Sequence, residues 1–142
     1  MKKLALVLAL VLCCSVLLVP TAMAEEVVNV YNWYDYMDER VFDLFYQETG
    51  IKVNCMYFTT NEDMMVQVRV SPGAYDVVFP SDYCVERMIE EGLLAEINFD
   101  NVPHFKYILD SLKNPDYDPE NKYSVPFMWG TVGILYNTTK VD

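Results

Sequence analysis

The sequence contains a single histidine, His104, and this shortage removes several kinds of enzyme chemistry. Catalytic sets such as Ser-His-Asp or Cys-His and histidine-based metal sites need a histidine placed among partners, whereas His104 stands alone beside Pro103. Only 5 glycines occur, and none belongs to a glycine-rich loop of the kind that holds a phosphate group. We therefore expect no catalytic residue, no metal site and no cofactor, and we interpret His104 as a surface or capping residue.

Basic residues are also scarce. The chain has 10 Lys and Arg against 21 Asp and Glu, which gives a net charge of −11 at pH 7. Such a protein repels nucleic acid and anionic lipid and attracts cations, so we expect no nucleic-acid partner. The same charge also keeps an exported protein soluble, and composition alone leaves both interpretations open.

Residues 1–24 have the pattern of a secretory signal peptide. Two lysines precede the uncharged, Leu- and Val-rich residues 4–19, and Ala22-Met23-Ala24 matches a small-x-small cleavage site. The apolar run falls short of the ~20 residues that a membrane-spanning helix needs. We expect export to the periplasmic space or the outer face of the cytoplasmic membrane, with a lipid anchor at Cys13 or Cys14 as a weaker alternative.

Two cysteines, Cys55 and Cys84, lie beyond this leader. An oxidising compartment permits a disulfide between them, but nothing in their spacing indicates that their Cα atoms approach each other. We favour two buried free thiols and leave the pairing open.

Strand and helix patterns alternate in the first part of the mature chain, which is typical of an α/β layer with a parallel sheet. Apolar, β-branched and aromatic segments predict strands at residues 27–31, 51–58 and 76–80. Helices are expected after three capping positions, Asp38, Thr60 and Ser81 or Asp82, and glycines end the first and third of them. Their apolar faces consist of Val41, Phe42, Leu44 and Phe45, then Met64, Met65 and Val68, then Val85, Met88 and Ile89.

The later part of the chain has weaker patterns. Residues 93–97 suggest a short extended segment, 105–112 a weakly amphipathic helix, and 124–127 and 132–136 two last strands. Asp116-x-Asp118-x-Glu120 resembles part of a calcium loop, but it lacks the central glycine and the distant glutamate, so we predict a solvated turn.

Rings and acids gather where the first and third predicted strands end. In an open parallel sheet, ligands bind beyond the carboxyl ends of the strands, so the two segments are expected to face one crevice. Aromatic faces attract an organic cation, and a carboxylate makes a charge-assisted hydrogen bond to an ammonium group. The candidate ligand-binding residues are Trp33, Tyr34, Asp35 and Tyr36 after the first strand, and Ser81, Asp82 and Tyr83 after the third.

Other interpretations of these residues remain open. The rings can belong to the core, and Asp35 and Asp82 can cap helices. As a carboxylate pair, these two acids are also the only candidates for glycoside hydrolysis, a weaker possibility with no other support.

Four stretches carry a resemblance to a known family. "VYNWYDYMDERVFDLFYQETGIKV", "TTNEDM", "GAYDVVFPSDYCVERMIEEGLL" and "YSVPFMWGTVGILYN" resemble the periplasmic spermidine/putrescine-binding proteins of bacterial polyamine ABC transporters. The resemblance runs from about Val28 to the end of the chain. It implies a monomeric two-lobed receptor that closes on a polyamine by hinge motion and delivers it to a membrane permease.

The resemblance also assigns roles to residues. The family pattern places Trp33, Tyr34, Asp35 and Tyr36 along the polyamine, with Asp35 taking an amine end. Ser81 and Tyr83 contribute as well, with Asp82 as a weaker candidate. Tyr34 stands where the family often has a small hydroxyl residue, which leaves the choice between spermidine and putrescine open.

Length is the main departure from the family, whose chains are more than twice as long. The resemblance implies that residues 25–136 are the N-terminal part of lobe 1 of a type II periplasmic-binding-protein fold, incomplete as it stands. Residues 137–142 would begin the hinge crossing, and the second lobe is absent from this sequence. A receptor of the same fold for a sugar or a ferric ion is the main alternative function.

Overall fold

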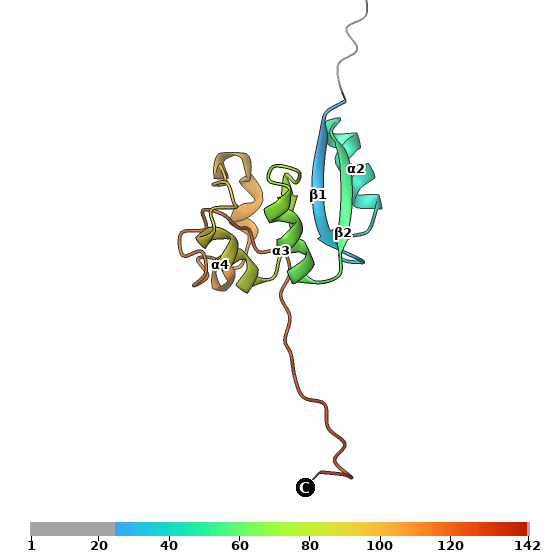
Figure 1. The fold of residues 1–142 in the computed structure, drawn as a ribbon, viewed down its shortest axis with the longest axis vertical. Helices are drawn as coiled ribbons and strands as arrows, with labels where there is room; N and C mark the ends of the chain where they lie inside the picture. Colours follow the sequence, from blue (N-terminus) through green and yellow to red (C-terminus); the bar gives the residue numbers. More distant parts are fainter. Residues whose placement is uncertain (1–24, 142) are drawn as a thin grey trace, which may run out of the picture.

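A computed structural model describes residues 25–141, so the predicted signal peptide with Cys13 and Cys14 lies outside the described residues. A three-stranded parallel sheet in the order β2-β1-β3 forms its centre. Helix α2 covers one face of the sheet, α3 lies on the other, and α4 packs beyond α3 (Figure 1). The predicted α/β layer is confirmed. The elements are β1 Val27–Trp33, α2 Arg40–Thr49, β2 Lys52–Phe58, α3 Asn61–Val70, β3 Val77–Val78 and α4 Asp82–Glu90.

All three strands run in the same direction, which brings their carboxyl ends to one edge of the sheet. The β1–β2 register runs from Val27↔Lys52 to Trp33↔Phe58, and β3 joins β1 at Tyr31↔Val78. The predicted end of β1 at Tyr31 is two residues short. Asn32 and Trp33 also belong to the strand, because β2 continues beside them and supplies their backbone partners.

Local capping signals define the helix boundaries as expected in most cases. The Thr60 hydroxyl accepts a hydrogen bond from the Asp63 amide at 3.1 Å, and Gly50 ends α2 in the left-handed conformation. Beyond α4, Gly92 has φ 66°, and the amides of Gly92 and Leu93 donate back to Ile89 and Met88. Helix α4 therefore ends in a Schellman motif, which needs a glycine at this position.

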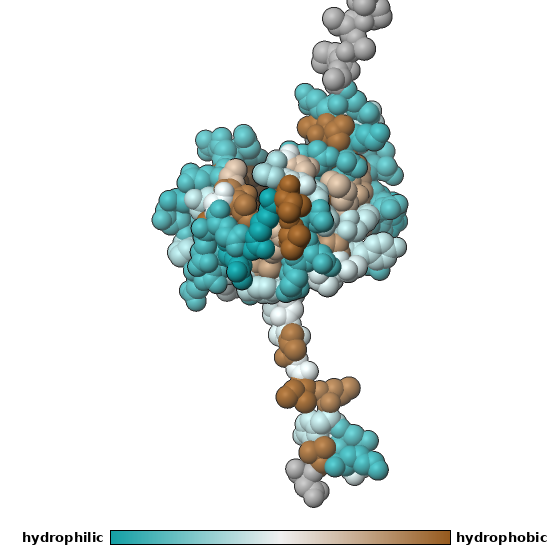
Figure 2. Space-filling model, in the orientation of Figure 1, coloured by the Kyte–Doolittle hydropathy of each residue, from teal (hydrophilic) through white to brown (hydrophobic). Residues whose placement is uncertain are grey.

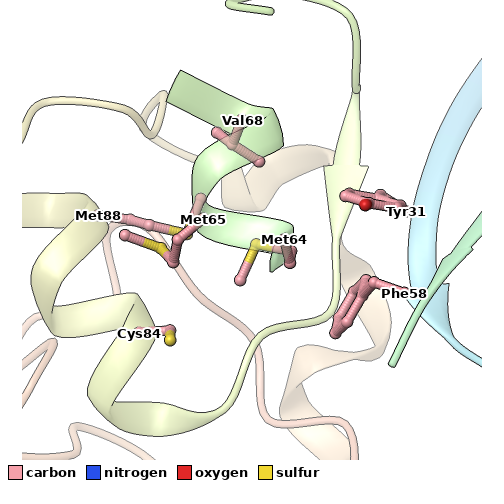
Figure 3. Close-up of a cluster of buried hydrophobic side chains, with 7 residues drawn as sticks. All are labelled: Tyr31, Phe58, Met64, Met65, Val68, Cys84 and Met88. Carbon is pink, nitrogen blue, oxygen red and sulfur yellow. The ribbon is translucent and has the colours of Figure 1, made fainter. Parts of the chain in front are cut away.

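The core lies between the sheet, α3 and α4. Figure 3 shows Tyr31 and Phe58 from the sheet facing the methionines of α3, with Cys84 and Met88 of α4 on the far side. Met64 and Met88 are fully buried, so both predicted helix faces contribute to the core. Tyr31 stacks on Tyr75 at 4.4 Å between ring centroids, as expected for a ring that belongs to the core.

Helix α2 differs from this pattern. Its apolar side chains occur at helical spacing, but Val41, Leu44 and Phe45 are exposed, and no residue of the helix is buried. The two cysteines are free thiols, as favoured, although only Cys84 is buried and Cys55 is half-buried. Burial raises the pKa of both thiols, so they stay protonated at neutral pH.

The weaker predictions for the later part of the chain are largely wrong. The amphipathic helix expected at 105–112 is replaced by the short 3₁₀ turns Pro103–Tyr107 and Asp110–Leu112, in which His104 is exposed as expected. Residues 124–127 and 132–136 form no strand, because neither segment pairs with a neighbouring strand among the described residues. Strand propensity is realised only where another strand completes the hydrogen bonding.

The turn at residues 115–124 is present, and Asp116 and Glu120 are exposed as predicted, but Asp118 is not. Asp118 is only 3 % exposed and accepts four hydrogen bonds, from the amides of Lys122, Tyr123 and Ser124 and from the Ser124 hydroxyl. The carboxylate therefore organises the turn internally.

The chain leaves the domain after Phe127, whose ring packs edge-on against Phe79 at 5.0 Å. Beyond that contact the backbone is extended, and Val132, Ile134 and Leu135 are exposed to solvent (Figures 1 and 2). Within residues 25–141, no helix has the length and apolar character required to cross a membrane.

Candidate functional site

Three loops meet at the carboxyl edge of the sheet, one at the end of each strand. We call residues 33–36, 59–62 and 80–83 the strand-end loops. The parallel register places all three at the same edge, as expected for the first and third of them. The second loop was not predicted as part of the site.

The first strand-end loop is a tight turn that contains three aromatic residues and one acid, Asp35. The Tyr36 amide approaches the Trp33 carbonyl at 3.5 Å, and the Trp33 and Tyr36 rings stack with centroids 5.7 Å apart. Trp33 is half-buried and also packs on Phe58 at 4.6 Å. Trp33 therefore packs against the core through Phe58 and against the exposed Tyr36.

Asp35 occupies the exposed tip of this turn with φ 64°, in the left-handed region that Asp and Asn tolerate better than most residues. It caps no helix, so the capping interpretation of Asp35 is wrong. Its neighbour Tyr34 is exposed and meets Tyr57 of β2 edge-on at 5.6 Å. The turn thus presents a carboxylate between two tyrosine rings.

The third strand-end loop is held by hydrogen bonds to Asn61, a residue that the sequence analysis did not predict as part of the site. Asn61, at the first turn of α3, donates from Nδ2 to the Ser81 hydroxyl and to the Tyr83 hydroxyl, both at 2.9 Å. Ser81 begins α4 by position, but its side chain makes no capping hydrogen bond. The Tyr83 hydroxyl lies 3.3 Å from a carboxylate oxygen of Glu62 and donates to it.

Asp82 faces a different direction. It lines a hollow of about 410 Å³ together with Tyr83, Glu86, Asp116 and Tyr117. Burial, followed by the negative charge of Asp82, raises the pKa of the Tyr117 phenol. Tyr83 lines this hollow as well, whereas residues 33–36 and Ser81 do not.

Asn32 is a second residue that the sequence did not indicate. It is fully buried beside Trp33, whose amide donates to Asn32 Oδ1 at 2.8 Å. Its Nδ2 is the one buried side-chain polar atom without a hydrogen-bond partner among the residues described. Leaving such a buried donor unpaired costs about 1–3 kcal/mol.

The chemistry of the strand-end loops suits a cation with apolar parts. Ring faces come from Trp33, Tyr36 and Tyr83, and carboxylates come from Asp35 and Glu62. Tyr34, Asp35, Tyr36 and Tyr83 are exposed to solvent. Among residues 25–141, no group of three or more His, Cys, Asp or Glu side chains is arranged to hold a metal ion.

Comparisons with known proteins agree with this architecture. The family model described as "Bacterial extracellular solute-binding protein" matches residues 40–142. The chain is 38 % identical over 120 residues to spermidine/putrescine-binding periplasmic protein 1 of Haemophilus influenzae, covering 83 % of this chain and 33 % of that one. It is 35 % identical over 136 residues to the putrescine-binding periplasmic protein SpuD of Pseudomonas aeruginosa, covering 94 % and 37 %.

Solved structures give the same result. The spermidine/putrescine ABC transporter substrate-binding protein PotD of Streptococcus pneumoniae superimposes with a TM-score of 0.75 at 37 % identity, over 82 % of this chain and 36 % of that chain. The chain thus spans about a third of the length of the relatives it matches. The match over residues 40–142 identifies the chain as a member of the bacterial extracellular solute-binding protein family.

Proposed function

We propose that this chain carries one side of the polyamine site in an extracytoplasmic solute receptor of an ABC importer. The observation that carries the proposal is the parallel register of β1 with both neighbours, because it gathers the ring- and acid-bearing loops at one edge. The relatives whose names specify spermidine or putrescine support the choice of ligand.

In this proposal the site residues keep the roles expected from the sequence. Asp35 accepts a hydrogen bond from a terminal ammonium group. Because both partners are charged, this bond is about twice as strong as one between neutral groups. Trp33, Tyr34, Tyr36 and Tyr83 contact the methylene and ammonium groups through their rings. Ser81 offers a hydroxyl oxygen, and Asp82 contributes charge from the neighbouring hollow.

The wider organisation is part of the same proposal. Residues 25–136 form the N-terminal part of lobe 1, and residues 137–142 begin the crossing to a second lobe. A polyamine would be enclosed between the lobes of a monomeric receptor and passed to a membrane permease outside the cytoplasm. The relatives are solute-binding proteins, which supports a binding role over catalysis.

A receptor of this fold for a ferric ion or a sugar is the competing proposal. A ferric receptor would be coloured by charge transfer from tyrosinate to iron. The absence of such colour in the purified protein exposed to ferric ion would disfavour the ferric alternative. A polyamine needs no tyrosinate.

Tryptophan fluorescence tests the proposal, because the chain has only two tryptophans. In a Trp129→Phe variant, emission comes from Trp33 alone, and we expect spermidine to change it saturably at constant ionic strength. Glucose and additional NaCl are expected to leave it unchanged. A Trp33→Phe variant, which reports only the exposed Trp129, is the matched control. A Trp33 signal that follows ionic strength alone would contradict the proposal.

A further inference from the structure

Asn61 makes three hydrogen bonds across two elements although it begins a helix. Its side chain is only 6 % exposed. Nδ2 donates to the hydroxyls of Ser81 and Tyr83 at 2.9 Å each, and Oδ1 accepts from the Ser81 amide at 3.2 Å. These bonds join α3 directly to the start of α4.

The Ser81 amide determines which way round the Asn61 side chain lies. A backbone N–H can only donate, so it must face Oδ1, and Nδ2 must then face the two hydroxyls. A rotated amide would place two donors against each other at Ser81. Asn61 therefore uses both Nδ2 hydrogens, one for each hydroxyl oxygen.

This arrangement determines what the two hydroxyls can still do. Tyr83 accepts from Asn61 and donates to Glu62 at 3.3 Å, so its phenol is held at both hydrogen-bonding positions. Ser81 keeps one lone pair and its proton. An exposed tyrosine otherwise samples several rotamers, and ordering such a side chain on binding reduces the affinity for the ligand.

We infer that Asn61 is a positioning residue for polyamine capture: it holds the Tyr83 ring and the Ser81 hydroxyl in place before the ligand arrives. The inference rests on the proposed function. Asn61 itself offers the ligand no free acceptor, since Oδ1 is occupied by the Ser81 amide. Its effect on affinity must therefore pass through Ser81 and Tyr83.

A double-mutant cycle tests this route. We expect Asn61→Ala to weaken spermidine binding by about 3- to 10-fold, the equivalent of one or two neutral hydrogen bonds. In a background that already carries Ser81→Ala and Tyr83→Phe, the same change should alter affinity by less than about 1.5-fold, because nothing is left to position. Asn54→Ala, which removes an exposed amide hydrogen bond to Asn29 in the middle of the sheet, is the control.

The outcomes separate this inference from the proposed function. Equal losses from Asn61→Ala in both backgrounds would show a general structural role and overturn the inference alone, as would no loss in either. If the unaltered protein does not bind spermidine, the proposed function fails and the inference fails with it. Amide exchange at Ser81, measured without ligand, is expected to accelerate in Asn61→Ala while exchange in β1 stays unchanged. Unchanged exchange at Ser81 would also overturn the inference.

Discussion

Asp35 combines an exposed charge with a left-handed backbone, and the two properties can be separated by substitution. Asn tolerates the left-handed region as Asp does, so Asp35→Asn should preserve the turn. It removes the carboxylate that we propose for the ammonium group. We expect spermidine affinity to fall about 2- to 5-fold, because an exposed charge pair is worth at most about 1 kcal/mol, with the melting temperature unchanged.

The control for Asp35→Asn is Glu48→Gln in the last turn of α2, an exposed change that alters the net charge equally and lies at the end of the helix opposite the strand ends. Titration of Trp33 fluorescence measures both variants. Equal loss of affinity in the two variants would mean that the protein attracts spermidine only through its overall charge.

At the scale of elements, Glu91 connects α3 to α4. Its carboxylate receives two hydrogen bonds from Arg69 of α3, at 2.6 and 2.7 Å, and one from Arg87 of α4 at 3.1 Å. These contacts, that with Arg69 foremost, lower the pKa of Glu91 from 4.5 to about 2. A carboxyl whose pKa is lowered by folding stabilises the folded state above its unfolded pKa, and this stabilisation is lost as the pH falls through the folded value.

Glu91→Gln therefore gives a pH-dependent prediction. We expect the variant to melt below the unaltered protein at pH 7, and the difference in melting temperature to shrink between pH 4.5 and about 2. Glu90→Gln, a neighbouring exposed change, is the control. A difference that is constant over this pH range would show that the ion pairs do not stabilise the α3–α4 contact.

The turn at 115–124 depends on Asp118 in a different way. In Asp118→Asn the new NH2 group must face at least one donor, because the Lys122 amide donates to the Oδ1 position and Tyr123 and Ser124 donate to the Oδ2 position. We expect a loss of about 2–3 kcal/mol in the free energy of unfolding, measured in urea. The exposed Asp116→Asn should change stability little. Equal effects of the two substitutions would contradict the internal role of Asp118.

The elements also show which features sequence reasoning can predict. Thr60, Gly50 and Gly92 act through hydrogen bonds within a few residues, so their capping roles follow from local pattern. The end of β1 and the link between α3 and α4 depend instead on hydrogen bonds between residues far apart in the sequence, which local patterns do not predict. Trp33 belongs to β1 because of β2, and Asn61 reaches Ser81 twenty positions along the chain. Nothing in the local sequence marks Asn61 as more than a first-turn residue of α3.

For the whole molecule, the position of the strand-end loops sets a limit on affinity. They contact a ligand from one side, and exposed charge pairs are worth only about 0–1 kcal/mol each. We expect calorimetry to find only weak spermidine binding by this chain, with a dissociation constant in the millimolar range. Micromolar affinity would mean that the described residues already enclose the ligand.

Apolar residues of α2 and of the tail after Phe127 are exposed on the surface of the molecule. Together with the unpaired edges of the sheet, they leave backbone and apolar groups open to self-association. We expect the protein to aggregate as its concentration rises, measured by light scattering. A monodisperse monomer at high concentration would contradict this expectation.

The central claim is that polyamines bind at the strand-end loops, and a ¹⁵N-resolved NMR titration with spermidine tests it most directly. At constant ionic strength, we predict saturable shift changes at residues 33–36, 59–62 and 80–83, with a midpoint in the millimolar range and little change in α2. Shifts spread over the acidic surface and reproduced by Mg²⁺, or no shifts at the strand ends, would contradict the claim.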